Sequence, residues 1–249
     1  MRFDRYYVSG LPAYFPFEMA IREEMVSYPS SGGKLTSLLA LPEEGGPFPA
    51  VVVIHEAYGL NDNVKDITRR FAGEGYVALG VDLFSNGPTW VCMARFFSGV
   101  VFNSLDHSGI KGLKASLDFL TKLPKVDSKR VGAVGYCLGG SFALAWACTD
   151  NRLKAIAPYY AQNPRPLKAV ERACPVVGSY PTGDPITTGD GHKLDARLDQ
   201  YGIEHDIKHY PGAKHGFFND TSTKYNEAAA NDSWKRVLAF FEEHVKVAG

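Results

Sequence analysis

The feature that most constrains the fold is a regular alternation of short apolar runs with longer amphipathic stretches. Short apolar runs bounded by glycine, proline or polar residues predict buried strands, and stretches of helical periodicity predict the helices that cover them. Strands that alternate with helices predict an α/β fold with a mostly parallel central sheet and helices on both faces. The expected strands are Pro49–His55, Tyr76–Leu83, Arg130–Val134, Leu153–Tyr160, Pro175–Ser179 and Glu204–Tyr210.

The rest of the chain is arranged around this sheet. Residues Glu23–Ala40 hold two short alternating runs around a Ser-Ser-Gly-Gly turn, which predicts an antiparallel hairpin at the N-terminal edge. No internal repeat divides the chain, so residues 1–249 are expected to form one domain, with 1–20 as an N-terminal extension and 85–104 as a candidate lid. Helices are expected over Asp62–Gly75, Leu113–Leu123, Phe142–Cys148 and about Ala228–Val247.

Charge and cysteine content narrow the classes of function. Lysine plus arginine and aspartate plus glutamate each total 27, so no basic field attracts nucleic acid or an anionic membrane. The first residues lack a long apolar run behind a charged start, which indicates neither a signal peptide nor a membrane anchor, and we expect a soluble cytoplasmic protein. The cysteines lack metal-type spacing and are expected to be free thiols: Cys92, Cys137, Cys148 and Cys174.

One turn between a predicted strand and a predicted helix carries the strongest chemical signal. Gly135, Cys137 and Gly139 form G-x-C-x-G, the pattern of a nucleophile elbow with cysteine in place of serine. A thiol at the following helix N-terminus would be shifted toward thiolate. The backbone N–H of Leu138 is expected to hold an oxyanion. The alternative is a buried structural cysteine beside packing glycines.

A cysteine nucleophile needs a base and an acid that orients the base. His215 lies in a glycine-flanked loop just after the predicted strand that ends at Tyr210, so it can reach the edge of the sheet where sites form. Asp184 follows the strand that ends at Ser179 and is favoured as the acid. Asp190 is the rival, although its position before an amphipathic stretch fits a helix N-cap better.

The other histidines give no comparable signal. His205 and His209 alternate along a predicted strand and are expected to be ordinary strand residues rather than a metal pair, because no other ligand has matching spacing. His107, His192 and His244 are expected to face solvent or to cap helices. We expect neither a metal nor an organic cofactor.

Taken together, four motifs resemble the dienelactone hydrolases (carboxymethylenebutenolidases) of the α/β-hydrolase superfamily. They are His-Glu-Ala-Tyr-Gly at 55–59, Gly-Tyr-Cys-Leu-Gly-Gly at 135–140, Asp184, and Tyr-Pro-Gly-Ala-Lys-His-Gly-Phe at 210–217. The resemblance extends from about Lys34 to the C-terminus and implies an α/β-hydrolase fold. It also implies that Cys137 is the nucleophile, His215 the base and Asp184 the acid.

The resemblance gives roles to two further residues. Glu56 matches a carboxylate that the family places beside the thiol, where it helps to convert the resting thiol to a thiolate when substrate arrives. Without the resemblance, Glu56 would be interpreted as a solvated charge at a strand end. The backbone N–H of Ala57 matches the second oxyanion donor, and that of Leu138 the first.

The sequence departs from the family where the substrate's carboxylate would bind. The best-known members carry arginines in two regions that here read Asp82–Trp90 and His215–Asp220, and neither contains arginine. Arg95 or Arg165 would have to substitute from other loops. Weak candidates for substrate contact are Trp90 and Phe96 in the candidate lid and Asn219 after the histidine.

These observations favour a cysteine-dependent hydrolase that opens a small lactone or another activated ester through a thioester. Its partner would be a small-molecule substrate. A lactone or activated ester is favoured because a thiolate expels a stabilised enolate more readily than a basic alkoxide. Two alternatives stay open. Cys137 could be a redox sensor, although no resolving cysteine lies nearby in sequence, or the chain could be a non-catalytic ligand-binding protein that retains the fold.

Overall fold

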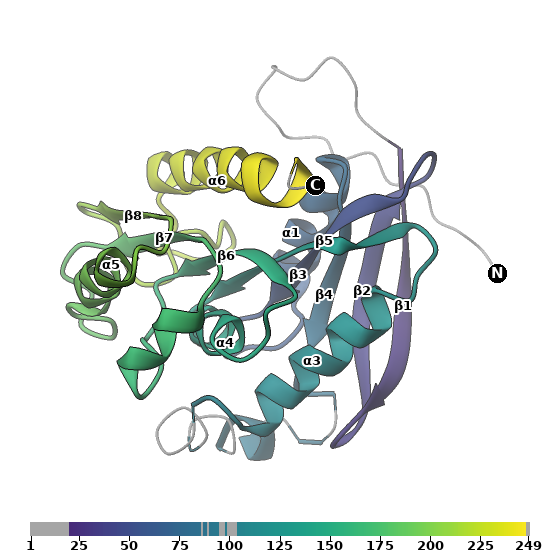
Figure 1. The fold of residues 1–249 in the computed structure, drawn as a ribbon, viewed down its shortest axis with the longest axis horizontal. Helices are drawn as coiled ribbons and strands as arrows, with labels where there is room; N and C mark the ends of the chain where they lie inside the picture. The colour runs from purple at the N-terminus through teal and green to yellow at the C-terminus, as the bar shows by residue number, and fades with distance from the viewer. Residues whose placement is uncertain (1–19, 86, 89, 95–97, 99–103, 248–249) are drawn as a thin grey trace.

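The central element of the computed structural model is one mixed β-sheet (Figure 1). The structure describes residues 20–247 except 86, 89, 95–97 and 99–103. Within this part, eight strands follow the order β1-β2-β4-β3-β5-β6-β7-β8. The strands are β1 Ile21–Ser30, β2 Gly33–Pro42, β3 Phe48–Ile54, β4 Val77–Asp82, β5 Val126–Tyr136, β6 Leu153–Tyr159, β7 Val176–Pro181 and β8 His205–Tyr210.

The predicted edge hairpin and parallel core are both confirmed. Strands β1 and β2 pair antiparallel, with Ser30 opposite Gly33 at the turn, and β2 pairs antiparallel with β4. From β4 to β8 all neighbouring strands are parallel. Residues Ala50–Ile54 of β3 are fully buried, as expected for an apolar strand covered on both faces.

Helices cover both faces of the sheet (Figure 1). Apolar side chains of α1 and α6 pack in the core of one face, and those of α3, α4 and α5 in the core of the other. The helices are α1 Asp62–Gly73, α3 Ser108–Leu120, α4 Leu138–Ala147, α5 Asp190–Tyr201 and α6 Glu227–Phe241, with a 3-10 turn at Leu167–Arg172 and a π turn at Glu242–Lys246.

Several predicted boundaries shift for identifiable reasons. Helix α3 begins five residues before Leu113 because the His107 side chain accepts the Gly109 N–H as an N-cap. Helix α4 begins immediately after Cys137, because the elbow turn leads directly into it. The expectation that Asp190 is an N-cap was wrong. Gly189 occupies the cap position in a left-handed conformation, and Asp190 is the first helical residue.

The topology brings the ends of separate strands to one edge. Because β3, β5, β7 and β8 are parallel, the segments after their C-terminal ends lie on the same side of the sheet. These segments carry Glu56, Cys137, Asp184 and His215, respectively. The extension 1–19 and most of the candidate lid, including Arg95 and Phe96, lie outside the described residues.

Candidate active site

Cys137 occupies a strained turn between β5 and α4. Its φ of 54° and ψ of −114° are unusual for a residue with a side chain, as a nucleophile elbow requires. A Cβ on Gly135 would overlap the backbone of Gly139, and a Cβ on Gly139 would overlap the carbonyl oxygens of Ile54 and His55. Only glycine at both positions allows helix and strands to approach this closely.

The resting thiol of Cys137 is neutral at physiological pH. Burial and then the nearby Glu56 carboxylate raise the pKa of Cys137 to about 12. The Leu138 N–H hydrogen-bonds to the thiol and lowers its pKa, so the helix N-terminus acts in the expected direction. It is outweighed by burial and by the carboxylate, so the shift toward thiolate expected from the helix N-terminus alone does not prevail and the resting group is a thiol.

His215 and Asp184 form a hydrogen-bonded pair. The His215 Nδ1 lies 2.7 Å from Asp184 Oδ2, which also accepts the Thr187 hydroxyl at 2.6 Å, and Asp184 Oδ1 accepts the Ile186 N–H. Burial opposes ionisation of Asp184, but the hydrogen bonds from Thr187 and His215 outweigh it and lower the pKa of Asp184. The carboxylate therefore accepts the Nδ1 proton. The His215 Nε2 is buried without a hydrogen-bond partner among the described residues.

Glu56 is a buried carboxyl rather than a solvated strand-end charge. It is 6% exposed, and the Tyr160 hydroxyl donates to its Oε1 at 3.1 Å. Burial raises the pKa of Glu56, although hydrogen bonds from Tyr160 and Asn219 act in the opposite direction. The Tyr160 ring also packs on His215, with centroids 4.9 Å apart. Tyr160 thus links the carboxyl to the imidazole.

A cavity of about 90 Å³ brings these groups together. Cys137, Glu56, Ala57 and His215, all from the quoted motifs, line it. Asp184 lies behind His215 instead of in the lining. The remaining lining residues are Tyr58, Gly216, Asn219, Ser222 and Lys224. A thiol, an unpartnered imidazole nitrogen and two backbone segments with N–H groups are the components needed to acylate a cysteine and then hydrolyse the acyl group.

The structure separates the weak candidates for substrate contact. Asn219 lines the cavity and donates to Glu56. Trp90 does not line it, and its side chain is 74% exposed. Sequence reasoning missed Tyr160 and Lys224, because neither lies in a recognisable pattern. Tyr160 stands directly after a central strand at the functional edge, and this position is the signal that could have identified it.

Comparisons with known proteins identify the family of this chain. The model of the dienelactone hydrolase family matches residues 35–245. The chain belongs to this family. A protein of Saccharolobus solfataricus named "Putative carboxymethylenebutenolidase" is 32% identical over 253 residues, covering 88% of this chain and 97% of the relative. A relative with the same name from Methylorubrum extorquens is 31% identical, covering 88% of this chain and 80% of the relative.

Solved structures of dienelactone hydrolases share the fold. The Klebsiella pneumoniae protein described as a dienelactone hydrolase superposes with a TM-score of 0.79 at 27% identity, covering 90% of this chain and 99% of that one. A dienelactone hydrolase-like promiscuous phosphotriesterase from metagenomic libraries gives 0.80 at 25% identity, covering 90% and 98%. The predicted α/β-hydrolase fold is confirmed.

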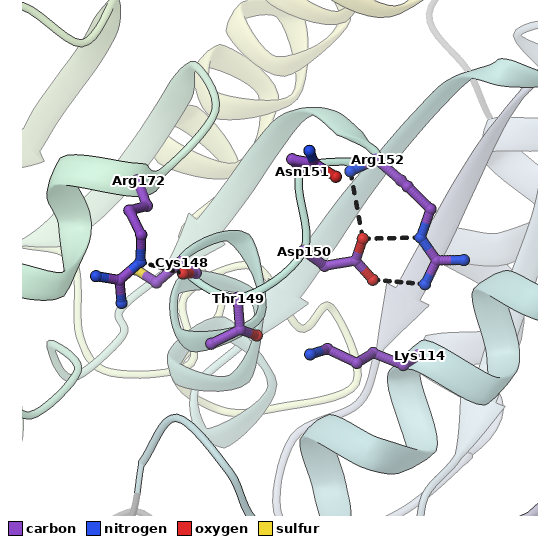
Figure 2. A pocket seen from close by; sticks show the side chains of 7 residues that line it. All are labelled: Lys114, Cys148, Thr149, Asp150, Asn151, Arg152 and Arg172. Atoms are coloured by element: carbon purple, nitrogen blue, oxygen red, sulfur yellow. Dashed lines mark hydrogen bonds and ion pairs between the residues drawn. The ribbon is translucent and has the colours of Figure 1, made fainter.

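This hydrolase has a second, larger cavity at the opposite end of α4 (Figure 2). Its volume is about 430 Å³, and it is lined by Lys114, Cys148, Thr149, Asp150, Asn151, Arg152 and Arg172. Arg152 and Asp150 form a two-pronged ion pair with N···O distances of 2.8 and 2.6 Å. The Trp146 indole N–H also donates to Asp150. Arg152 and Asp150 therefore satisfy each other.

The other histidines of the hydrolase have structural surroundings. On β8, His205 pairs with Asp195 at 3.3 Å, and His209 stacks on His192 with ring centroids 3.8 Å apart. Among the described residues, the group with metal-ligand spacing is Glu204, Glu243 and His244, at the surface away from Cys137. No helix in the described part is long and apolar enough to cross a membrane.

Proposed function

We propose that this hydrolase opens a small lactone or another activated ester through a thioester on Cys137. The observation that carries the proposal is the small cavity shared by the strained Cys137 and the unpartnered Nε2 of His215, whose Nδ1 is held by Asp184. A structural cysteine needs neither the strained backbone nor an orienting Asp–His pair. No role in this mechanism requires a metal or an organic cofactor.

The first half of the reaction is acylation of the thiol. When substrate enters, the Cys137 thiol gives its proton to Glu56, whose pKa burial raises above the ordinary glutamate value. The thiolate attacks the carbonyl carbon, while the N–H groups of Leu138 and Ala57 hold the oxyanion. The tetrahedral intermediate collapses, the C–O bond of the ring breaks, and the leaving oxygen departs as an enolate. The acyl group then remains on sulfur as a thioester.

The second half is hydrolysis of this thioester. His215 Nε2 takes a proton from water, and the resulting hydroxide attacks the thioester carbonyl. Asp184 stabilises the imidazolium that forms at His215. Collapse of the second tetrahedral intermediate breaks the C–S bond and releases the product acid. The thiolate takes back the proton held by Glu56, and the His215 imidazolium gives its proton to the enolate formed in the first half. General-base catalysis of this kind contributes about 10² to 10⁴ in rate.

Lys224 supplies a cation where the family arginines are missing. It lines the same cavity as Glu56 and Cys137, and its charge lowers the pKa values of both. Among the described residues no carboxylate lies within ion-pair distance of Lys224. We therefore propose an anionic substrate whose carboxylate Lys224 contacts.

The experiment compares steady-state hydrolysis of p-nitrophenyl acetate and of a dienelactone by the wild type, Cys137→Ala and Cys148→Ala. The matched control removes the cysteine at the other end of the same helix. Loss of turnover in Cys137→Ala alone is the expected result. Wild-type turnover that survives in Cys137→Ala would refute the cysteine mechanism. Tight lactone binding without any turnover by the wild type would favour a binding protein.

A further inference from the structure

His55 is a buried histidine that the mechanism above does not use. It follows the last residue of β3 and is 2% exposed. Its Nε2 accepts the backbone N–H of Leu83, just after β4, at 3.1 Å. A nitrogen that accepts a hydrogen bond carries no proton, so in a neutral imidazole the proton is on Nδ1. Burial lowers the pKa of His55, which keeps the ring neutral.

The Nδ1 proton points to the carbonyl oxygen of Glu56, 2.5 Å from Nδ1. This carbonyl belongs to the same peptide unit as the N–H of Ala57. A trans peptide is planar, with its C=O and N–H pointing in opposite directions. Fixing the carbonyl of Glu56 therefore fixes the direction of the Ala57 N–H, which belongs to a residue lining the Cys137 cavity.

The hydrogen bond from His55 to the Glu56 carbonyl also makes the Ala57 N–H a stronger donor. A donor on a peptide carbonyl polarises the amide and strengthens hydrogen bonds from its N–H. The Asp82 carboxylate does not compete for the Nδ1 proton of His55. Asp82 Oδ1 lies 3.9 Å from the ring's Nε2, the unprotonated nitrogen, and already accepts the N–H of Phe84 at 2.9 Å.

The same strand end contacts the helix that carries the nucleophile. Gly139 of α4 packs against the carbonyl oxygens of Ile54 and His55. The two oxyanion donors, on Leu138 and Ala57, therefore come from two segments in direct contact. His55 is the side chain that ties the second segment to the sheet through both of its ring nitrogens.

We propose that His55 is a positioning residue that orients and polarises the Glu56–Ala57 peptide so that the Ala57 N–H can hold the oxyanion. The inference rests on the proposed function, because it assumes that an oxyanion forms beside Cys137. Packing alone would not require this tautomer, since an apolar side chain can fill a buried strand end without a proton donor or acceptor.

Two substitutions test the hydrogen bonds of the two His55 ring nitrogens separately. In His55→Asn the amide group can occupy the place of Nδ1 and donate to the Glu56 carbonyl. In His55→Gln the amide oxygen can occupy the place of Nε2 and accept the Leu83 N–H. We expect His55→Gln to lower kcat for p-nitrophenyl acetate about 10- to 100-fold with little change in KM, somewhat less than removal of a whole donor. His55→Asn should retain most of the wild-type kcat.

A thionoester analogue of the same substrate distinguishes positioning from a merely structural role. Sulfur accepts hydrogen bonds poorly, so its reaction depends less on the oxyanion donors. The ratio of kcat for the ester to kcat for the thionoester should fall in His55→Gln and stay near the wild-type value in His55→Asn. Equal losses in both variants with an unchanged ratio would overturn the inference.

The tautomer can be tested in the wild type even if the variants do not fold. The ¹⁵N spectrum of the histidine rings should show His55 with its proton on Nδ1 and a bare Nε2. A proton on Nε2 would overturn the inference. Failure of the proposed function is separately visible, because Cys137→Ala would then keep its turnover. Loss of turnover in Cys137→Ala with an unaffected His55→Gln would refute the role of His55 alone.

Discussion

Helix α4 carries a cysteine at each end, and the two thiols have different surroundings. The pKa of each is raised to about 12, chiefly by burial. Cys137 is at the N-terminal end, on a strained turn, with an N–H directed at its sulfur and a buried carboxyl nearby. Cys148 is the C-cap with ordinary helical φ and ψ, and its carbonyl accepts the Arg172 guanidinium. A raised thiol pKa therefore does not identify a nucleophile, and backbone geometry separates the two.

The charged groups beside the two cysteines differ in the same way. Beside Cys148, Asp150 is neutralised by Arg152, as Figure 2 shows. Beside Cys137, Glu56 has no arginine partner and His215 Nε2 has no partner among the described residues. Charged groups that pair with one another are not available to a ligand, whereas the unpartnered Nε2 of His215 is available to a substrate.

The largest effect is expected from replacing His215, the proposed base, which lines the cavity at the N-terminal end of α4. His215→Ala should lower kcat for ester hydrolysis by about 10² to 10⁴, because no group then activates water against the thioester. Steady-state kinetics measures this loss. His205→Gln, on β8 and paired with surface acids, is the matched control and should leave kcat unchanged. A similar loss in both variants would mean that the effect is structural.

The tight backbone packing around Cys137, in contrast to the ordinary helical backbone at Cys148, can be tested by adding one methyl group to a glycine. Gly139→Ala should destabilise the protein by about 1–3 kcal/mol or prevent folding, because its Cβ would overlap the carbonyls of Ile54 and His55. Gly73→Ala in α1 is the control, since its Cβ would meet no atom within 4 Å. It should stabilise α1 by up to about 1 kcal/mol. Thermal unfolding measures both, and equal melting temperatures would contradict the account of the elbow.

The electrostatic contrast predicts a pH effect on thiol alkylation. Below a pKa of about 12, the thiolate fraction of Cys137 rises about tenfold per pH unit, and alkylation by iodoacetamide should rise with it. Glu56→Gln removes a negative charge, which lowers the pKa of Cys137 and accelerates alkylation at any pH below the pKa. Turnover should fall in the same variant because the proton acceptor is lost.

Cys148 is the internal control for this experiment. It is 2% exposed, and Glu56 is not among the groups that shift its pKa, so its slow alkylation should not change in Glu56→Gln. Mass spectrometry of peptides measures both sites in one sample. An unchanged rate at Cys137 would show that the carboxyl does not control the thiol.

The smallest effect is expected in the KM for an anionic substrate. Lys224→Met should raise KM for an anionic lactone by about tenfold or less, the scale of a partly exposed charge interaction, and leave neutral esters unaffected. Lys154→Met, an exposed lysine on β6, is the matched control. Equal KM values for the anionic lactone in the wild type and Lys224→Met would remove this residue from substrate binding.

Much of this molecule could be predicted from local pattern. The β3 strand is apolar throughout, and the glycines around Cys137 are required by sterics, so both were visible in the sequence. The exact starts of α3 after His107 and of α5 after Gly189 were not, although a capping role was one of the two expected for His107, because caps depend on one side chain or one backbone conformation. Tyr160 and Lys224 reach the site only through tertiary packing.

The central claim is that Cys137 carries the acyl group, and trapping that adduct tests it most directly. In His215→Ala acylation should proceed while deacylation stalls. Intact-mass and peptide spectra after p-nitrophenyl acetate should therefore show one acetyl group on Cys137 and none on Cys148. An unmodified Cys137 in this variant, while the wild type turns over the same ester, would contradict the account.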